Sequence, residues 1–225
     1  MTPADIRQHQ HYKPALRAMG QQVRQRLAAN PRVWPFPTEK AEIFAVGEFM
    51  NADECARMMT MIDAVARPSS VLGDSYENTF RTSYSGDVDP HDPFVKKLDR
   101  RLDDLMGVDT AWGETIQGQR YEEGQQFKAH NDWFYPDTGY WTDETRRGGQ
   151  RAWTAMVYLN DVTEGGTTEF TEVAMAVEPK QGTLILWNNA LPDGMPNEAT
   201  MHAGRPVMKG SKYVITKWYR AQPWR

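Results

Sequence analysis

Cysteine is almost missing from this sequence. Cys55 is the only cysteine among 225 residues, so an intramolecular disulfide and a cysteine-rich zinc site are both excluded. A reducing compartment is the simplest interpretation, and we predict a cytoplasmic protein. Cys55 itself is expected to be a small apolar side chain on the buried face of a helix.

Long apolar runs and an excess of positive charge are missing as well. No run approaches the roughly 18 apolar residues of a membrane span, and the amino-terminal residues lack the apolar segment of a secretory signal. The net charge of −4 gives no reason to expect nucleic acid, whose binders usually present a basic face. We therefore expect neither a membrane nor a nucleic acid as partner, and the oligomeric state stays open.

The remaining composition is that of a globular protein in two parts. The chain is 40% hydrophobic and 25% charged, and its length fits one domain with an extension. Residues 1–40 form the predicted extension: one or two exposed helices interrupted by Pro14, then the proline-rich linker "NPRVWPFPTEK". Residues 41–225 form the predicted main domain.

The main domain begins with helical signals and then changes to strand signals. Asn51 and Glu54 form a capping-box pattern before "ECARMMTMIDAVA". The stretch "DPFVKKLDRRLDDLMG" predicts a second helix. From about residue 112, short β-branched and aromatic segments alternate with Gly, Asp, Asn and Pro. This order predicts an α+β fold, in which helices pack outside an all-β sandwich or barrel.

A histidine and a carboxylate stand two positions apart in "FKAHNDWFYPDTGYW". Residues i and i+2 of a strand face the same side, so His130 and Asp132 can point at one place. Taken alone, this pair is more simply a hydrogen-bonded pair at a strand end. A metal site needs a third ligand from elsewhere in the chain.

Five histidines are present, and His202 is the best candidate for that third ligand. His9 and His11 lie in the polar extension and are expected to be solvated, and His91 precedes a helix and fits turn chemistry. Two histidines, one carboxylate and open positions form the facial triad of non-haem Fe(II) oxygenases, in which a co-substrate and O2 must both reach the iron.

An oxygenase of this kind also needs a cation for the far carboxylate of 2-oxoglutarate. Lys212 follows His202 on the strand after the "PVMKGS" turn, where its ammonium group can lie in a partly apolar barrel. The alternative for Lys212 is an ordinary exposed lysine on a strand.

Several motifs, in order, resemble one family. "FRTSYSG", "RYEEGQQFKAHND", "GGQRAWTAMVYLNDVTEGGTTEF", "EPKQGTLILWNN" and "MHAGRPVMKGSKYVITKWYR" are similar to segments of the prolyl 4-hydroxylase branch of the 2-oxoglutarate/Fe(II) dioxygenases. The resemblance covers residues 41–221. It implies a double-stranded β-helix (jelly-roll) core with supporting amino-terminal helices.

The resemblance also implies roles for single residues. His130, Asp132 and His202 match iron ligands, and Lys212 matches the residue that binds the co-substrate's far carboxylate. Thr168, Trp218 and Arg151 keep structural alternatives, as a strand-pairing residue, a core residue and a surface ion pair. The residues that match co-substrate contacts are Tyr121, Thr168, Trp218 and Lys212, and those expected at the substrate are Arg81, Arg151, Trp133 and Tyr140.

Two segments are expected to act as lids: "VLGDSYENTFRTSYSG" and "WFYPDTGYWTDETRRGG". The aromatic residues of the second segment would suit an extended, proline-containing peptide, or they could pack on the barrel or at a dimer contact. The chain departs from its relatives at Phe127, where a tyrosine is frequent, and in the length of the segment 133–149. Both departures concern the substrate and leave the iron ligands intact.

The resemblance implies a hydroxylase that uses Fe(II), 2-oxoglutarate and O2, with ascorbate as reductant and succinate and CO2 as co-products. The expected substrate is a prolyl residue in a peptide or protein. A free amino acid or another small molecule is the alternative substrate. A non-catalytic β-fold that binds peptides is a third, different interpretation.

Overall fold

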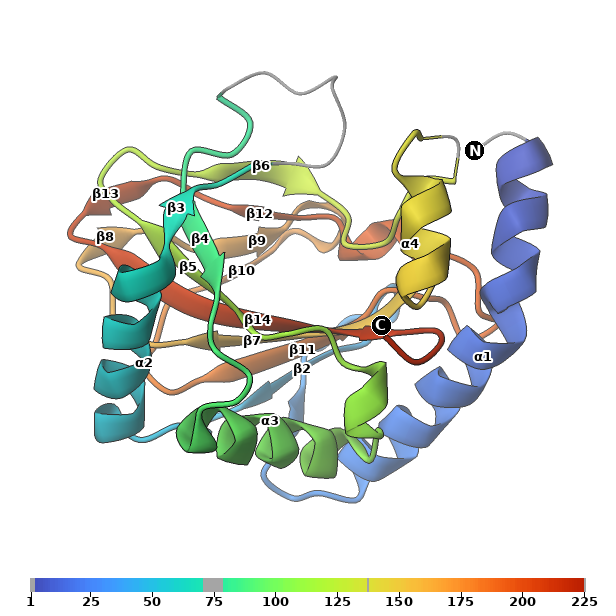
Figure 1. The fold of residues 1–225 in the computed structure, drawn as a ribbon, viewed down its shortest axis with the longest axis horizontal. Helices are drawn as coiled ribbons and strands as arrows, with labels where there is room; N and C mark the ends of the chain where they lie inside the picture. Colours follow the sequence, from blue (N-terminus) through green and yellow to red (C-terminus); the bar gives the residue numbers. More distant parts are fainter. Residues whose placement is uncertain (1–2, 71–78, 137, 225) are drawn as a thin grey trace.

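Two facing β-sheets and a layer of helices build the protein (Figure 1). The computed structural model describes residues 3–70, 79–136 and 138–224. The larger sheet has eight antiparallel strands in the order β1-β2-β11-β7-β14-β5-β4-β3. These are β1 (Trp34–Pro35), β2 (Ile43–Val46), β11 (Leu184–Asn188), β7 (Arg151–Tyr158), β14 (Lys212–Arg220), β5 (Gln117–Tyr121), β4 (Tyr84–Asp87) and β3 (Arg67–Pro68).

A smaller antiparallel sheet lies opposite one face of the larger sheet (Figure 1). Its order is β10-β9-β12-β6, and a separate two-stranded ribbon pairs β13 with β8. The strands are β6 (Phe127–His130), β8 (Glu164–Gly165), β9 (Thr168–Phe170), β10 (Met175–Val177), β12 (His202–Gly204) and β13 (Val207–Lys209).

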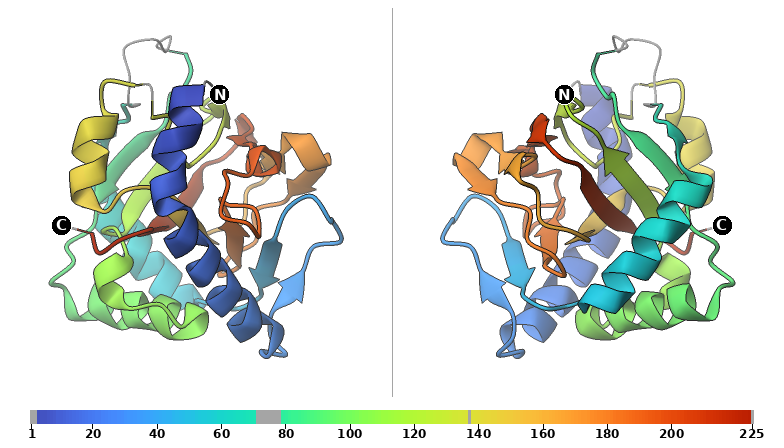
Figure 2. Two further views of the ribbon diagram at one scale, coloured as in Figure 1. Left: turned by 90° about the vertical axis from the view of Figure 1, so that its right-hand side faces the viewer. Right: turned by 90° about the vertical axis from the view of Figure 1, so that its left-hand side faces the viewer.

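Helices cover the other face of the larger sheet (Figures 1 and 2). The predicted α+β plan, with helices outside a two-sheet core, is therefore confirmed. The helices are α1 (Pro3–Ala28), α2 (Ala52–Val65), α3 (Pro93–Met106) and the short α4 (Trp141–Arg147), with single 3-10 turns η1 (Thr110–Trp112), η2 (Thr171–Val173) and η3 (Glu198–Thr200).

Local sequence signals account for the ends of α2 and α3. The Asn51 side chain accepts a hydrogen bond from the backbone of Glu54, and the Glu54 side chain accepts one from the backbone of Asn51, so the predicted capping box is confirmed. Asp92 caps α3 by accepting from the backbone N–H groups of Phe94 and Val95, with Pro93 in the first turn. Gly107 ends α3 with a left-handed backbone at φ 68°.

The prediction of exposed helices before residue 30 was wrong. One continuous helix, α1, runs through Pro14 and buries a stripe of apolar side chains in the same core as α2, α3 and the sheet. Burial of this stripe compensates the backbone hydrogen bond that a proline removes from a helix. The buried residues of the stripe are Tyr12, Leu16, Met19, Val23 and Leu27.

Strict alternation along the central strands separates two cores. On β7, Trp153, Ala155 and Val157 pack in the core beneath the helices, whereas Met156 and Tyr158 pack between the two sheets. This is the period of two that a strand buried on both faces requires. The same alternation on β14 directs one set of side chains toward the helices and the other toward the space between the sheets.

The two predicted lids differ in outcome. The segment 133–149 contains a helix, α4, and its role as a lid stays a prediction. Part of the other segment, residues 71–78, lies outside the described residues. Among the helices of the described ranges, none has the length and apolar character to cross a lipid bilayer.

Candidate functional site

Two neighbouring strands of the smaller sheet bring three potential metal ligands together. β12 pairs with β6 so that His202 lies directly opposite His130, and Asp132 follows β6 by two positions. One ligand atom from each of the three side chains lies within 4.8 Å of the others. In the described part of the chain, this is the one group of three or more such side chains that could hold an ion.

Hydrogen bonds to backbone carbonyls fix the tautomer of both imidazoles. Nδ1 of His130 lies 2.8 Å from the Lys128 carbonyl oxygen, and Nδ1 of His202 lies 2.9 Å from the Thr200 carbonyl oxygen. A carbonyl only accepts, so each Nδ1 carries the proton and each Nε2 keeps its lone pair. This is the arrangement that ligating histidines usually show.

Asp132 is oriented from behind by Thr154. The Thr154 hydroxyl donates to Oδ2 of Asp132 at 2.7 Å, and the Asn189 amide donates to that hydroxyl at 2.9 Å. Two imidazole nitrogens and a carboxylate oxygen form a donor set that suits non-haem Fe(II) and leaves coordination positions open.

The electrostatics favour the metal-binding protonation state of each ligand. Burial, reinforced by the neighbouring His202, lowers the pKa of His130 to about 3. Burial alone would raise the pKa of Asp132, but His202, His130 and Arg151 together with the Thr154 hydrogen bond outweigh it and lower that pKa. A neutral imidazole and a charged carboxylate are the forms that bind metal ions.

A small inner cavity of about 50 Å³ extends from these ligands between the two sheets. Lys212 lies in its wall, with 3% of its surface exposed, and its Nζ donates to Oγ1 of Thr168 at 3.3 Å. No carboxylate of the described residues forms an ion pair with Lys212. Burial therefore lowers the pKa of Lys212 to about 7.

Two tyrosine rings and a series of hydrogen-bonded polar side chains lie near Lys212. Lys212 Nζ lies 5.4 Å from the ring centres of both Tyr121 and Tyr158. The Tyr121 hydroxyl donates to the Gln119 amide oxygen at 2.8 Å, and Gln119 donates to Thr216 at 3.2 Å. The predicted co-substrate residues therefore share one cavity: Tyr121, Thr168, Lys212 and Trp218 all line it.

A larger outer groove of about 350 Å³ meets the inner cavity at the metal ligands. Five residues line both the outer groove and the inner cavity: Arg81, Phe127, His130, Asp132 and Trp218. All four residues predicted at the substrate, Arg81, Arg151, Trp133 and Tyr140, line the outer groove.

All four residues are engaged in packing or pairing, including Arg81 over Phe127 and Tyr140 against Phe134. Trp133 is only 3% exposed and packs against Tyr135, with ring centres 4.4 Å apart. Arg151 forms a bidentate pair with Glu114, through bonds of 2.7 and 2.8 Å. The Arg151 guanidinium also lies 3.8 Å above the Trp218 ring. Arg151 is therefore half-buried, pairs with Glu114 and also forms part of the groove wall.

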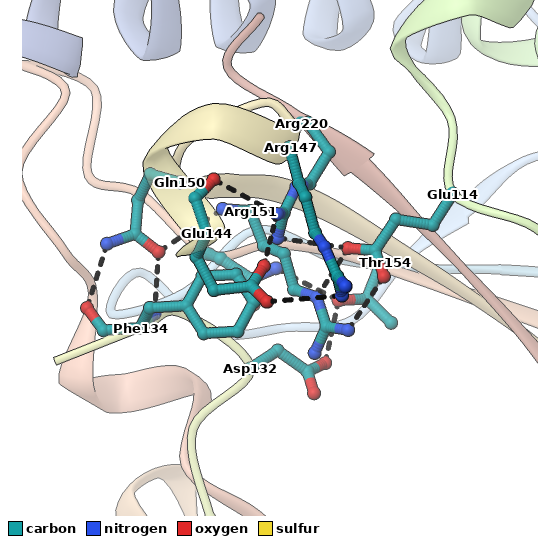
Figure 3. Close-up of polar contacts among 10 residues, drawn as sticks. Glu114, Asp132, Phe134, Glu144, Arg147, Gln150, Arg151, Thr154 and Arg220 are labelled. Carbon is teal, nitrogen blue, oxygen red and sulfur yellow. Dashed lines mark hydrogen bonds and ion pairs between the residues drawn. The ribbon is translucent and has the colours of Figure 1, made fainter. Parts of the chain in front are cut away.

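Sequence reasoning missed the residues that support the site. Figure 3 shows Thr154 behind Asp132, and Glu114, Glu144 and Arg220 around Arg151. Alternation on β7 could have indicated Thr154, because it faces the same side as Met156. The partners of Arg151 carried no signal, because they meet only through the pairing of β14 with the segment before β5 and with β7.

Comparison with known proteins gives consistent matches. The family model of the 2OG-Fe(II) oxygenase superfamily matches residues 116–220. Probable prolyl 4-hydroxylase 4 of Arabidopsis thaliana is 30% identical over 215 residues, which cover 84% of this chain and 70% of that protein. Prolyl 4-hydroxylase subunit alpha-1 of Homo sapiens is 34% identical over 149 residues, which cover 66% of this chain and 28% of that subunit.

Solved structures share the fold. A viral collagen prolyl hydroxylase from Paramecium Bursaria Chlorella virus-1, in a 2OG complex, superposes with a TM-score of 0.63 at 24% identity, over 79% of this chain and 95% of that chain. A Trichoplax adhaerens prolyl hydroxylase in complex with a hypoxia inducible factor peptide gives 0.61 at 15% identity, over 92% and 90%. The predicted jelly-roll core is thereby confirmed.

Proposed function

Because this chain belongs to the 2OG-Fe(II) oxygenase superfamily, on its prolyl 4-hydroxylase branch, we propose that it hydroxylates a prolyl residue of a peptide or protein. The chain is an enzyme of the 2-oxoglutarate/Fe(II)-dependent type. The prolyl substrate is proposed here from the names of its relatives and from the shape of the outer groove.

We assign Nε2 of His130, Nε2 of His202 and the Asp132 carboxylate to Fe(II). Their convergence within 4.8 Å and the protonated Nδ1 atoms support this assignment. When bound, Fe(II) and 2-oxoglutarate together activate O2 for insertion into a C–H bond, with succinate and CO2 as co-products. Thr154 holds Asp132 in the orientation that the metal requires.

One observation carries the co-substrate assignment: a buried lysine without a carboxylate partner among the described residues shares a cavity with the metal ligands. A buried ammonium is costly unless an anion pairs with it. We propose that Lys212 and Thr168 bind the far carboxylate of 2-oxoglutarate, and that Tyr121 and Trp218 form the walls beside it. The Tyr121 hydroxyl, now bonded to Gln119, is positioned by that bond.

The outer groove supports a peptide rather than a single amino acid. It is larger than the inner cavity, opens at His130 and Asp132, and is lined by aromatic rings of Phe80, Tyr135 and Trp224. Aromatic-lined grooves suit extended, proline-containing segments. Arg81, Arg151, Tyr140 and Trp133 stay our proposed substrate contacts. Ascorbate as reductant and a cytoplasmic location stay predictions made from the sequence.

The test measures two products from purified protein supplied with Fe(II), 2-oxoglutarate and air. Mass spectrometry should detect succinate, and a library of proline-containing peptides should yield products that have gained one oxygen atom. His202→Ala should abolish both products, whereas His91→Ala, a change at an exposed turn remote from β6 and β12, should retain them.

The outcomes separate the rival functions. Absence of succinate from the metal-loaded protein would contradict a dioxygenase. Turnover of free L-proline without any peptide product would replace the peptide by a small molecule. Full activity in His202→Ala would favour a peptide-binding protein in which this triad does not hold a catalytic metal.

A further inference from the structure

A cluster of charged side chains connects helix α4 to the metal site. Three arginines, Arg147, Arg151 and Arg220, surround two glutamates, Glu114 and Glu144 (Figure 3). The cluster lies beside Asp132, whose pKa is among those that Arg151 influences. Arg147, Arg151, Glu114 and Glu144 line the outer groove, and Arg220 lies behind them.

The half-buried Arg151 and the buried Arg220 use up both glutamates. Arg151 holds Glu114 through two bonds of 2.7 and 2.8 Å, and Arg220 lies 3.2 Å from the same Glu114. Arg220 is fully buried and also pairs with Glu144. Each glutamate carboxylate is thus committed to a guanidinium that cannot leave it for solvent.

Arg147 is the cation that remains. Its side chain is 63% exposed, and its only acidic neighbour among the described residues is Glu144, at 4.0 Å. The other carboxylate oxygen of Glu144 already accepts from Arg220. An exposed pair at such a distance contributes little, so Arg147 is available to a ligand.

Helix α4 holds Arg147 over the groove. Trp141 and Glu144 are buried on the inner side of α4, which attaches the helix to the body of the protein. Arg147 lines the groove, whereas the adjacent Arg146 does not. Arg146 instead is 75% exposed and pairs with Asp143 at 3.6 Å. The two neighbouring arginines therefore differ in whether they line the outer groove.

Other charges of the groove do not neutralise Arg147. Arg81 stacks over Phe127, 4.7 Å from the ring centre, and within the described ranges it has no carboxylate partner. Two further acids line the groove: Asp132, which belongs to the group of metal ligands, and Asp87, at the end of β4. Within the described ranges neither Asp87 nor Asp132 forms an ion pair with Arg147, so Glu144 at 4.0 Å is its one acidic partner there.

We propose that Arg147 binds a carboxylate of the substrate, so that the enzyme prefers substrates with a negative charge close to the hydroxylated residue. This inference rests on the proposed function. A guanidinium matches a carboxylate in shape and in hydrogen-bonding pattern. The carboxylate has two possible sources, an acidic side chain of a peptide or the free carboxyl terminus that follows the target residue.

The experiment compares matched peptides. One series places Glu or Gln at each position around a single proline, with both ends blocked, and a second pair differs only in a free or amidated carboxyl terminus. The wild type should prefer the charged member of one series by roughly two- to fivefold in kcat/KM, since the pair is partly exposed. Raising the salt concentration should reduce this preference.

Variants assign the preference to one side chain. Arg147→Ala should remove the preference, by lowering kcat/KM for the charged peptides to the value for their neutral counterparts. Arg146→Ala should keep the preference, which controls for helix charge and for α4 folding. Arg147→Glu should turn the preference toward Lys-containing peptides. Binding of the same peptides, measured by fluorescence anisotropy, gives a readout that does not depend on oxygen insertion.

The outcomes are distinguishable from failure of the proposed function. Equal rates and affinities for charged and neutral peptides in the wild type, or a preference that survives Arg147→Ala, would overturn the inference while prolyl hydroxylation stands. A binding preference that Arg147→Ala abolishes supports the inference even where no peptide gains oxygen, and in that case the proposed function alone fails.

Discussion

Two lysines of strand β14, Lys212 and Lys217, are buried on opposite faces of the larger sheet. Lys217 is 1% exposed and Lys212 is 3% exposed. Lys217 points toward α3, where Asp99 and Asp103 both accept hydrogen bonds from it. Lys212 points between the two sheets, where its one hydrogen-bond partner among the described residues is the neutral Thr168.

The comparison separates a structural charge from a functional one. Asp103 also accepts from Tyr219 and Thr110, at 2.8 and 2.6 Å, so the charge of Lys217 is neutralised by carboxylates of the chain itself. The charge of Lys212 is not balanced in this way. An unpaired buried cation lowers stability, and such groups cluster at binding sites, where a ligand supplies the counter-charge.

The largest expected effect is on stability, in Lys217→Met. This change leaves the buried Asp103 and the half-buried Asp99 without their cation, and breaking a buried pair in this way costs about 3–5 kcal/mol. Urea unfolding should show that loss, while the affinity of the folded protein for 2-oxoglutarate stays unchanged. Lys96→Met, at an exposed position on α3, is the control. Equal stability of the two variants would contradict a structural role for Lys217.

Lys212→Met should weaken co-substrate binding without lowering the stability of the protein. Loss of the cation that pairs with a buried carboxylate should weaken 2-oxoglutarate binding by about 2–5 kcal/mol, which is roughly 30-fold to a few thousand-fold in Kd. Without co-substrate, the variant should be more stable than wild type, because an unpaired buried charge is gone. Calorimetric titration and urea unfolding measure the two effects. Unchanged affinity would remove Lys212 from the co-substrate site.

The stability difference between Lys212→Met and wild type should depend on pH. Burial lowers the pKa of Lys212 from 10.5 to about 7, so between these values the unfolded chain binds more protons than the folded protein. Stability of the wild type should therefore rise with pH across this window relative to the variant. The deficit is complete below pH 7 and disappears above pH 10.5. A difference that is constant with pH would contradict the assignment.

Affinity for 2-oxoglutarate should fall as the pH rises, because it depends on the same Lys212 proton. Only the protonated lysine attracts a carboxylate, so Kd for 2-oxoglutarate should increase severalfold for each pH unit above about 7. In Lys212→Met this dependence should be absent. Titrations at several pH values measure it, and a slope that persists in the variant would assign it to another group.

The sequence allowed the triad to be predicted because few residues could supply it. His130 and Asp132 share a strand face by their spacing, and the remaining histidines left His202 as the natural third donor. The capping box of α2 was equally local, since Asn51 and Glu54 bond to each other's backbone. Features that depend on neighbours in sequence were therefore predictable.

Other features required the register of distant strands. Glu114 meets Arg151 and Arg220 because the segment before β5 bonds to the end of β14, which pairs with the start of β7. Helix α4 lacks a side-chain cap, and its Glu144 is held by Arg220 from the far end of the chain. The burial of α1 was different, because Leu16, Val23 and Leu27 already stand at helical spacing in the sequence, where Pro14 obscured the pattern.

Thr168→Val gives the smallest effect and the sharpest test of how Lys212 is positioned. Valine keeps the shape of the side chain and removes the hydroxyl that accepts from Lys212 at 3.3 Å. One neutral partner of a charged group contributes about 1 kcal/mol, so Kd for 2-oxoglutarate should increase roughly fivefold. The double variant Thr168→Val/Lys212→Met should be no weaker than Lys212→Met alone, because the hydroxyl acts through the lysine. Additive losses would instead mean that Thr168 binds the carboxylate independently of Lys212.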